Sequence, residues 1–220
     1  RITGTVGLAA AKHAEIYASG DVFLAEVKAS NLYVNATDNI ASDAAVVVSG
    51  VTDFISGGEI NIRADNNALN QMSIRAEGDI FLQSTTQVLL REAITDGSLQ
   101  VTASGIILGG EIKADTLTAN SDVGGLSVFG QVMIDSDIVL DSTGSLVMSH
   151  DGKVESEAGN ISITTDWDQQ IGLLAAHEGN VFLHSGGAIS DSNDSQGPAL
   201  NIKANVFNAR AERGIGAYWG

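Results

Sequence analysis

The sequence predicts an all-β fold, a single-stranded parallel β-helix with about 20 residues per coil. A short phrase recurs along the chain: glycine, a small polar or acidic residue, then an apolar-any-apolar triplet, as at residues 58–62, 78–82, 159–163 and 179–183. Such a phrase indicates a tight turn that enters a short strand. The triplets begin at residues 60, 80, 99, 117, 138, 161, 181 and 200. This period is typical of a solenoid whose coils bury their inward residues by stacking.

Composition supports the same fold class. The 220 residues include 25 glycines but one proline, with 44% apolar and 5% aromatic residues, so the interior must consist largely of Ala, Val, Ile and Leu. A β-sandwich would show hairpin turns at a shorter spacing of about 8–12 residues. A leucine-rich repeat would show its Leu and Asn framework, and propeller blades would carry aromatic signatures. The parallel β-helix fits best.

The elements follow from the phrase in chain order. Residues 1–20 indicate an incomplete first coil, and triplets continue from Val22 onward. The triplets are less regularly spaced over residues 34–60, including residues 49–53, which predicts a longer turn or a small loop there. Residues 190–198 are the clearest predicted loop. Stacking one coil apart predicts three further pairs. Asn160 and Asn180 should hydrogen-bond, Glu59 and Asp79 should repel unless water or a cation separates them, and Ser162 and Phe182 should share an outward row.

Charge and cysteine content exclude several function classes. The formal net charge of −16 disfavours nucleic acid and anionic membrane as partners and makes cations the more natural small ligands. No apolar run is long enough for a membrane span, and the first residues do not form a signal peptide. Without cysteine, a small disulfide scaffold is excluded. Because the chain begins and ends inside its own pattern, we expect residues 1–220 to be one shaft segment of a longer repetitive protein.

The repeats resemble those of a known family. The sequence pattern resembles the repeats of filamentous haemagglutinin-like bacterial adhesins and related giant surface proteins. The resemblance rests on residues 186–191, 197–204 and 214–216 and on the recurring Gly-Asp/Asn-Ile/Val phrases. The resemblance implies a right-handed β-helical shaft of a large protein that is secreted or displayed on a bacterial cell surface. It implies a structural or adhesive role, with glycans or proteins of host or neighbouring cells as partners and self-association with further repeats.

A carbohydrate-active enzyme is the alternative, because parallel β-helices also host polysaccharide lyases and glycoside hydrolases. Asp135, Asp137 and Asp141 form the densest acidic run, and alternation on a strand would place Asp135 and Asp137 on one face. Two such carboxylates suit glycoside hydrolysis. No Arg or Lys lies between Lys113 and Lys153, so this neighbourhood lacks a cation for the transition state. The sequence therefore favours a non-catalytic shaft.

One turn combines an aromatic ring with two acids. Asp166, Trp167 and Asp168 present an indole between carboxylates, on which a sugar ring can stack. The competing interpretation is a tryptophan that covers the edge of the coil core. These three residues are the candidate carbohydrate contact.

Metal ligands are the remaining candidates. Asp191, Asn193 and Asp194 suggest a structural Ca²⁺ loop, although the EF-hand spacing fails and an Asx-rich turn explains the same residues. His177 and His184 are a possible zinc pair without further ligand spacing. No other cofactor is expected. Ice binding would need a row of threonines at the coil period, and Thr102 and Thr118 do not continue into one.

Overall fold

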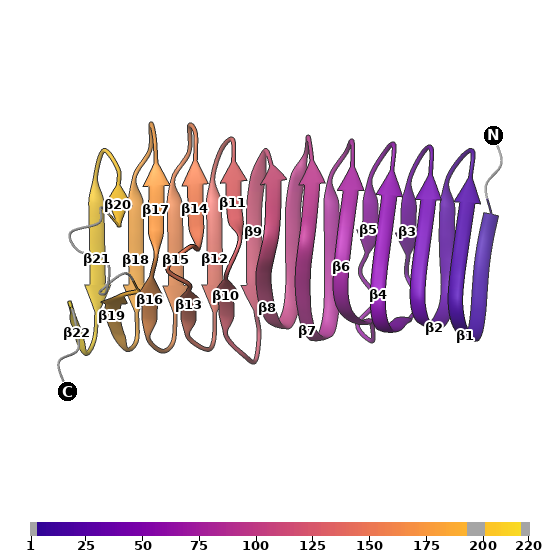
Figure 1. Ribbon diagram of the computed structural model, residues 1–220, viewed down its shortest axis with the longest axis horizontal. Helices are drawn as coiled ribbons and strands as arrows, with labels where there is room; N and C mark the ends of the chain where they lie inside the picture. The colour runs from indigo at the N-terminus through magenta and orange to yellow at the C-terminus, as the bar shows by residue number, and fades with distance from the viewer. Residues whose placement is uncertain (1–3, 193–200, 217–220) are drawn as a thin grey trace.

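The computed structural model describes residues 4–192 and 201–216 and contains, within those ranges, β-strands and no helix. The strands stack into one elongated solenoid along a single axis (Figure 1). Every strand pairing between described residues is parallel. The all-β parallel β-helix predicted from the sequence is confirmed.

Each coil has three faces, which we number in the order the chain follows them. Four long strands bend around corners and contribute to all three faces: β1 (Gly4–Ala18), β2 (Val22–Ala36), β7 (Ile80–Thr95) and β8 (Ser98–Ala114). Two strands contribute to faces 2 and 3: β4 (Val46–Ser56) and β6 (Ala68–Ala76).

The remaining strands each belong to one face. Face 1 contains β3 (Ile40–Ser42), β5 (Ile60–Ile62), β9 (Thr116–Ser121), β12 (Ile138–Ser142), β15 (Ile161–Thr165), β18 (Val181–Ser185) and β21 (Phe207–Ala211). Face 2 contains β10 (Leu126–Val128), β13 (Leu146–Met148), β16 (Gln169–Ile171), β19 (Ala188–Asp191) and β22 (Gly214–Ile215). Face 3 contains β11 (Gln131–Ile134), β14 (Lys153–Ser156), β17 (Leu173–Ala176) and β20 (Ile202–Lys203).

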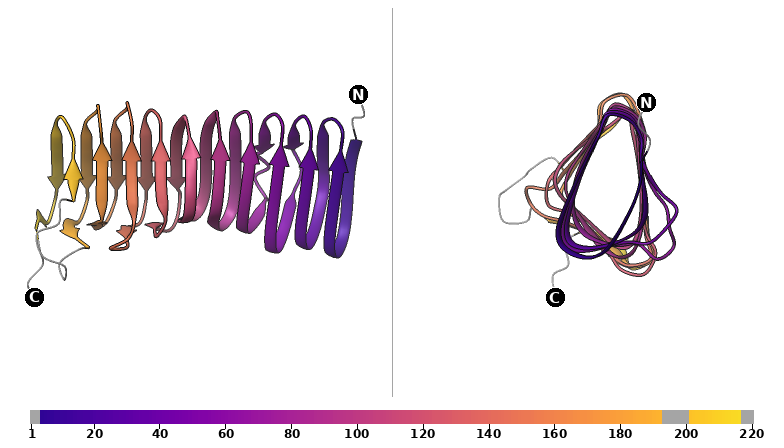
Figure 2. Two further views of the ribbon diagram at one scale, coloured as in Figure 1. Left: turned by 45° about the horizontal axis from the view of Figure 1, so that its top comes forward. Right: turned by 90° about the vertical axis from the view of Figure 1, so that its right-hand side faces the viewer.

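The path of the chain is right-handed. In Figure 1 the face 3 strands rise on the near side, the face 1 strands return on the far side, and the coils advance from right to left. Viewed along the axis, the coils superpose as a rounded triangle that narrows at the corner joining face 3 to face 1 (Figure 2). Parallel strands joined by crossovers of this hand are the strongly preferred arrangement.

The register confirms a period of about 20 residues. Equivalent outward positions on face 1 are 18–23 residues apart from Phe23 to Phe182, and neighbouring coils lie about 4.8 Å apart. Ser162 and Phe182 occupy this one row, as predicted. The complete row is Thr5, Phe23, Ala41, Asn61, Phe81, Gln100, Thr118, Val139, Ser162, Phe182 and Asn208.

Inward side chains form one continuous apolar column through the solenoid. On face 1, for example, Ile138, Ile161 and Val181 stack on one another and are fully buried. Each such aliphatic side chain contributes about 1.5–3 kcal/mol by burial. The core extends without a break from Ala14 to Ile189. A coil alone could not bury these residues, so the stacking itself holds the fold together.

Buried hydroxyl groups bind the backbone where the chain turns. At the corner between faces 1 and 2, Ser185 Oγ donates to the Trp167 carbonyl at 2.7 Å and accepts from the Gly187 N–H at 3.1 Å. At the corner between faces 3 and 1, Ser156 Oγ likewise donates to the Ser136 carbonyl at 2.7 Å. These bonds satisfy polar groups that the turn leaves without a strand partner.

Five local predictions need correction. The first coil is not incomplete, because β1 pairs with β2 on all three faces. Residues 49–53 do not form a loop, because β4 continues through them and pairs with β2 and β6. Ser190 and Asp191 belong to β19, so the predicted loop starts too early. The next coil after Val181 pairs at Phe207, 26 residues later, and not at residue 200, which lies outside the described residues. Asp135 and Asp137 lie in the turn between β11 and β12, not on a strand.

Candidate functional site

Trp167 lies at the corner between faces 1 and 2 and projects outward. Its side chain is 56% exposed, so it does not cover the edge of the core. The Arg213 guanidinium carbon lies 5.9 Å from the centroid of the indole ring, within range of a cation–π contact. The Arg213 backbone N–H donates to the Gly187 carbonyl, and the Gly186 N–H donates to the Thr165 carbonyl. Because the intervening coil carries glycines here, the two long side chains can meet across it.

The two acids beside Trp167 have different environments. The Asp168 carboxylate accepts a hydrogen bond of 2.7 Å from the Ala188 N–H and so supports the next coil. Asp166 is exposed, and its backbone N–H donates to the Ser142 carbonyl. The predicted carbohydrate contact is thus an exposed indole between two exposed acids, of which Asp168 also supports the next coil.

The acidic run splits between a corner and a face. Asp137 Oδ1 accepts from the Asn160 backbone N–H at 2.7 Å, which assigns this carboxylate a structural role. Asp141 lies on β12 in register with Asn120 and Thr164 on face 1. Asp135 lines a cavity of 270 Å³ together with Glu155, Glu157 and His177, and with Met133 and Ile134.

This cavity contains a charged network that the sequence reasoning missed. Glu155 pairs with Lys153 at 2.7 Å and lies 3.5 Å from His177 Nε2, while Lys203 Nζ lies 3.1 Å from His177 Nδ1. Glu155 is in register with Ala175, which lies 20 residues or one coil later, and His177 follows two residues beyond Ala175. The repeat period could therefore have indicated their proximity.

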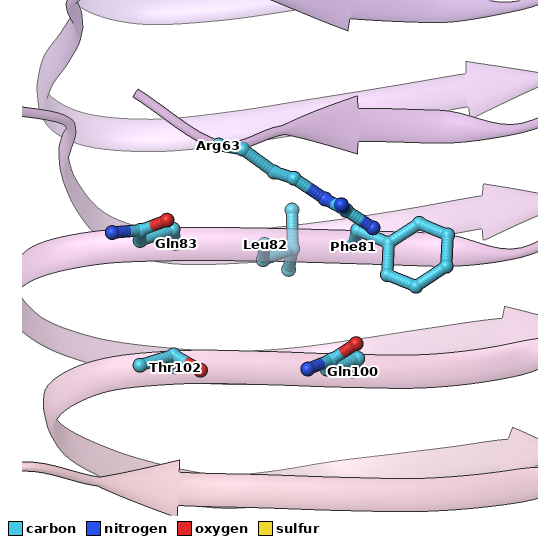
Figure 3. A pocket seen from close by; sticks show the side chains of 6 residues that line it. All are labelled: Arg63, Phe81, Leu82, Gln83, Gln100 and Thr102. Atoms are coloured by element: carbon cyan, nitrogen blue, oxygen red, sulfur yellow. The ribbon is translucent and has the colours of Figure 1, made fainter. Parts of the chain in front are cut away.

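A second cavity, of 180 Å³, opens on face 1. We call it the Arg63 hollow; it is lined by Arg63, Phe81, Leu82, Gln83, Gln100 and Thr102 (Figure 3). The Arg63 side chain crosses to the next coil and places its guanidinium carbon 4.0 Å from the centroid of the Phe81 ring. Leu82 points into the core, so its strand forms the floor. Sequence reasoning did not indicate this site, because its residues come from three successive coils.

The structure describes only some of the candidate metal ligands. Asp191 ends β19 opposite Ile171, whereas Asn193 and Asp194 lie outside the described residues. His177 lies in a corner, while His184 lies on β18 between Thr164 and Arg210 in register. Among residues 4–192 and 201–216, no group of three or more His, Cys, Asp or Glu side chains is placed to hold a metal ion. Bound Ca²⁺ stays a prediction.

Comparison of the chain with protein-family models, with curated proteins and with solved structures found no match. The described residues contain no helix that is long and apolar enough to cross a membrane. The fold and these surface features are therefore the basis for a functional proposal.

Proposed function

We propose that this chain is a non-catalytic structural and adhesive shaft segment of a large bacterial protein that is secreted or displayed on the cell surface. The observation that carries the proposal is the unbroken solenoid, in which one core runs from Ala14 to Ile189. Such a stack is stiff and repeats its surface at each coil. The resemblance of its repeats to filamentous haemagglutinin-like adhesins supports the same role.

Attachment to glycans or proteins of host or neighbouring cells is the proposed activity. Exposed aromatic side chains on the shaft suit such contacts, since Trp167, Phe182 and Phe23 are each more than one third exposed. The test is the retention of beads coated with the folded chain on bacterial and epithelial cell layers. We expect saturable retention above that of beads coated with the heat-unfolded chain. Equal retention of both bead types would reject the adhesive role.

A polysaccharide-cleaving enzyme is the second candidate, and the cavity around Glu155 is the observation that favours it. Three carboxylates and a histidine meet there, which is a set of groups suited to acid–base work. The shaft proposal expects no release of reducing ends from polysaccharides. Cleavage that is lost in Glu155→Gln but kept in Glu111→Gln would establish the enzyme. Glu111 is a matched control, because it pairs with Lys113 at 2.5 Å and does not line the cavity.

A further inference from the structure

Part of face 1 carries almost no charge, although the chain has 27 acidic residues. From β5 to β9 the outward side chains are amides and hydroxyls, with one aromatic ring and one arginine. They are Asn61, Arg63, Phe81, Gln83, Ser98, Gln100, Thr102, Thr116, Thr118 and Asn120. Amides and hydroxyls both donate and accept hydrogen bonds, as the hydroxyl groups of a sugar do. We call these residues the amide strip.

Arg63 gives the strip an anchor at the hollow. The Arg63 guanidinium carbon lies 4.0 Å from the centroid of the Phe81 ring. A guanidinium group in contact with an aromatic ring keeps its N–H donors in its own plane, where they remain available to a ligand. Among the described residues, none of the ion pairs involves Arg63. Its side-chain donors therefore face the hollow or solvent without a carboxylate partner in that part of the chain.

The glutamines and the threonine complete the lining. Gln83 Nε2 donates to Asp65 Oδ1 at 2.9 Å, which fixes the amide and leaves its carbonyl oxygen as an acceptor. The side chains of Gln100 and Thr102 take part in none of the hydrogen bonds between described residues. Figure 3 shows both on the coil that follows Phe81, on the opposite side of the hollow from Arg63.

Charge and size define the ligand. A polyanionic chain would meet the Asp65 carboxylate at the margin and the net charge of −16 over the rest of the rod, so an uncharged ligand fits better. The hollow of 180 Å³ suits one sugar ring and is smaller than the roughly 300 Å³ or more of pockets that enclose drug-sized ligands. The coil spacing of about 4.8 Å is close to the length of one pyranose unit in an extended β-linked glycan.

We propose that the Arg63 hollow binds one unit of an uncharged, extended β-linked polysaccharide, whose next units lie along the amide strip over β8 and β9. The inference rests on the proposed attachment function and names the class of glycan that this face recognises. Arg63 donates to ring hydroxyls, while Gln83, Gln100 and Thr102 exchange hydrogen bonds with neighbouring hydroxyls.

The test is calorimetric titration of the chain with cellopentaose, with pentagalacturonate as its charged counterpart. We expect millimolar binding of cellopentaose, weaker binding of pentagalacturonate, and at least a tenfold loss of cellopentaose affinity in Arg63→Gln. Arg210→Gln is the matched control, because Arg210 is exposed on face 1 far from the hollow and loses the same charge. Circular dichroism checks that both variants keep the fold.

Three results would overturn this inference: no binding of cellopentaose, tighter binding of pentagalacturonate, or equal loss in Arg63→Gln and Arg210→Gln. The cell-retention assay separates it from the proposed function. If beads coated with the wild-type chain and beads coated with Arg63→Gln are retained equally, attachment occurs through another surface. That result rejects the hollow as the attachment site. Absence of any retention rejects the adhesive shaft itself.

Discussion

Asn180 donates both its backbone N–H and its side-chain amide to Oδ1 of Asn160, at 3.1 and 3.0 Å. Asn160 makes the same two bonds to Asp137 one coil earlier, at 2.7 and 3.3 Å. The three residues form a side-chain ladder parallel to the rod axis at the corner between faces 3 and 1. Such a ladder supplies the backbone N–H groups of the turn with acceptors and sets the stacking of successive corners.

Replacing Asn160 by alanine tests this ladder. The variant removes the acceptor of two Asn180 donors and leaves a partly buried N–H without its partner, so we expect a loss of about 1–2 kcal/mol in the free energy of unfolding. Urea denaturation followed by circular dichroism measures the change. Asn120→Ala, on the outward side of face 1, should change stability by less than about 0.5 kcal/mol. Equal effects of both variants would remove the ladder as a source of stability.

Close backbone approach at the same corner requires glycine at position 179. A Cβ atom there would collide with the carbonyl group of Gly159 one coil earlier, and Gly179 is buried. We expect Gly179→Ala to cost about 2–3 kcal/mol, because the two coils must move apart. Gly7→Ala is the control, since its nearest neighbour would be Glu26 O at 3.7 Å, an ordinary contact. A thermal melting point of Gly179→Ala equal to that of wild type would contradict the steric requirement.

The repeat phrase made most of the fold predictable. Residues such as Gly179, Asn180 and Val181 combine a turn signal with strand alternation, and their recurrence at one period identifies which residues stack. The prediction failed where spacing alone could not separate a corner from a loop. Residues 49–53 read as a turn but continue β4: the register shifts between Val48 and Val51, and alternation resumes with Thr52 inward and Asp53 outward.

The surface sites were less predictable. Arg63, Phe81 and Gln100 come from successive coils, and their meeting depends on the rotamer of a long side chain that spacing does not specify. Glu155 and His177 could have been paired from the period, but the Lys203 contact could not, because Lys203 stacks on Ala175, which is 28 residues earlier and not one period earlier. For Trp167 the sequence left an exposed ring and a ring covering the core edge as alternatives, and its contact with Arg213 depends on glycines in the coil between them.

The inward and outward positions of β15 give a direct test of the alternation. Ile161 is fully buried, so Ile161→Asp places a charge in the core and should lower the free energy of unfolding by about 4 kcal/mol or more. Ser162 is the next residue and faces outward, so Ser162→Asp should change it by less than about 0.5 kcal/mol. Urea unfolding of both variants checks the difference. Similar destabilisation by the two would contradict the assigned faces.

Trp167→Ala separates binding from stability. The Trp167 carbonyl accepts bonds of 2.7 Å from Thr165 Oγ1 and from Ser185 Oγ, and these bonds survive the substitution because they use the backbone. We therefore expect the melting temperature to stay within about 2 °C of wild type, since exposed positions change stability little. Retention of coated beads on cells should fall. A large loss of stability would instead show that the indole protects the core.

His13, Glu15 and Tyr17 form a cluster on β1, and this cluster predicts a measurable shift in the pKa of Glu15. The hydrogen bond from His13, at 2.8 Å, and then the bond from the Tyr17 hydroxyl, at 3.2 Å, lower the pKa of Glu15 below its ordinary value of 4.5. Because the folded-state pKa is the lower one, the contribution to stability is present above pH 4.5 and is lost as the pH falls through the folded-state value. An NMR titration of the Glu15 carboxyl carbon measures this directly. His13→Ala should raise the pKa of Glu15 more than Tyr17→Phe does, because His13 is the larger cause, and the reverse order would contradict the assignment.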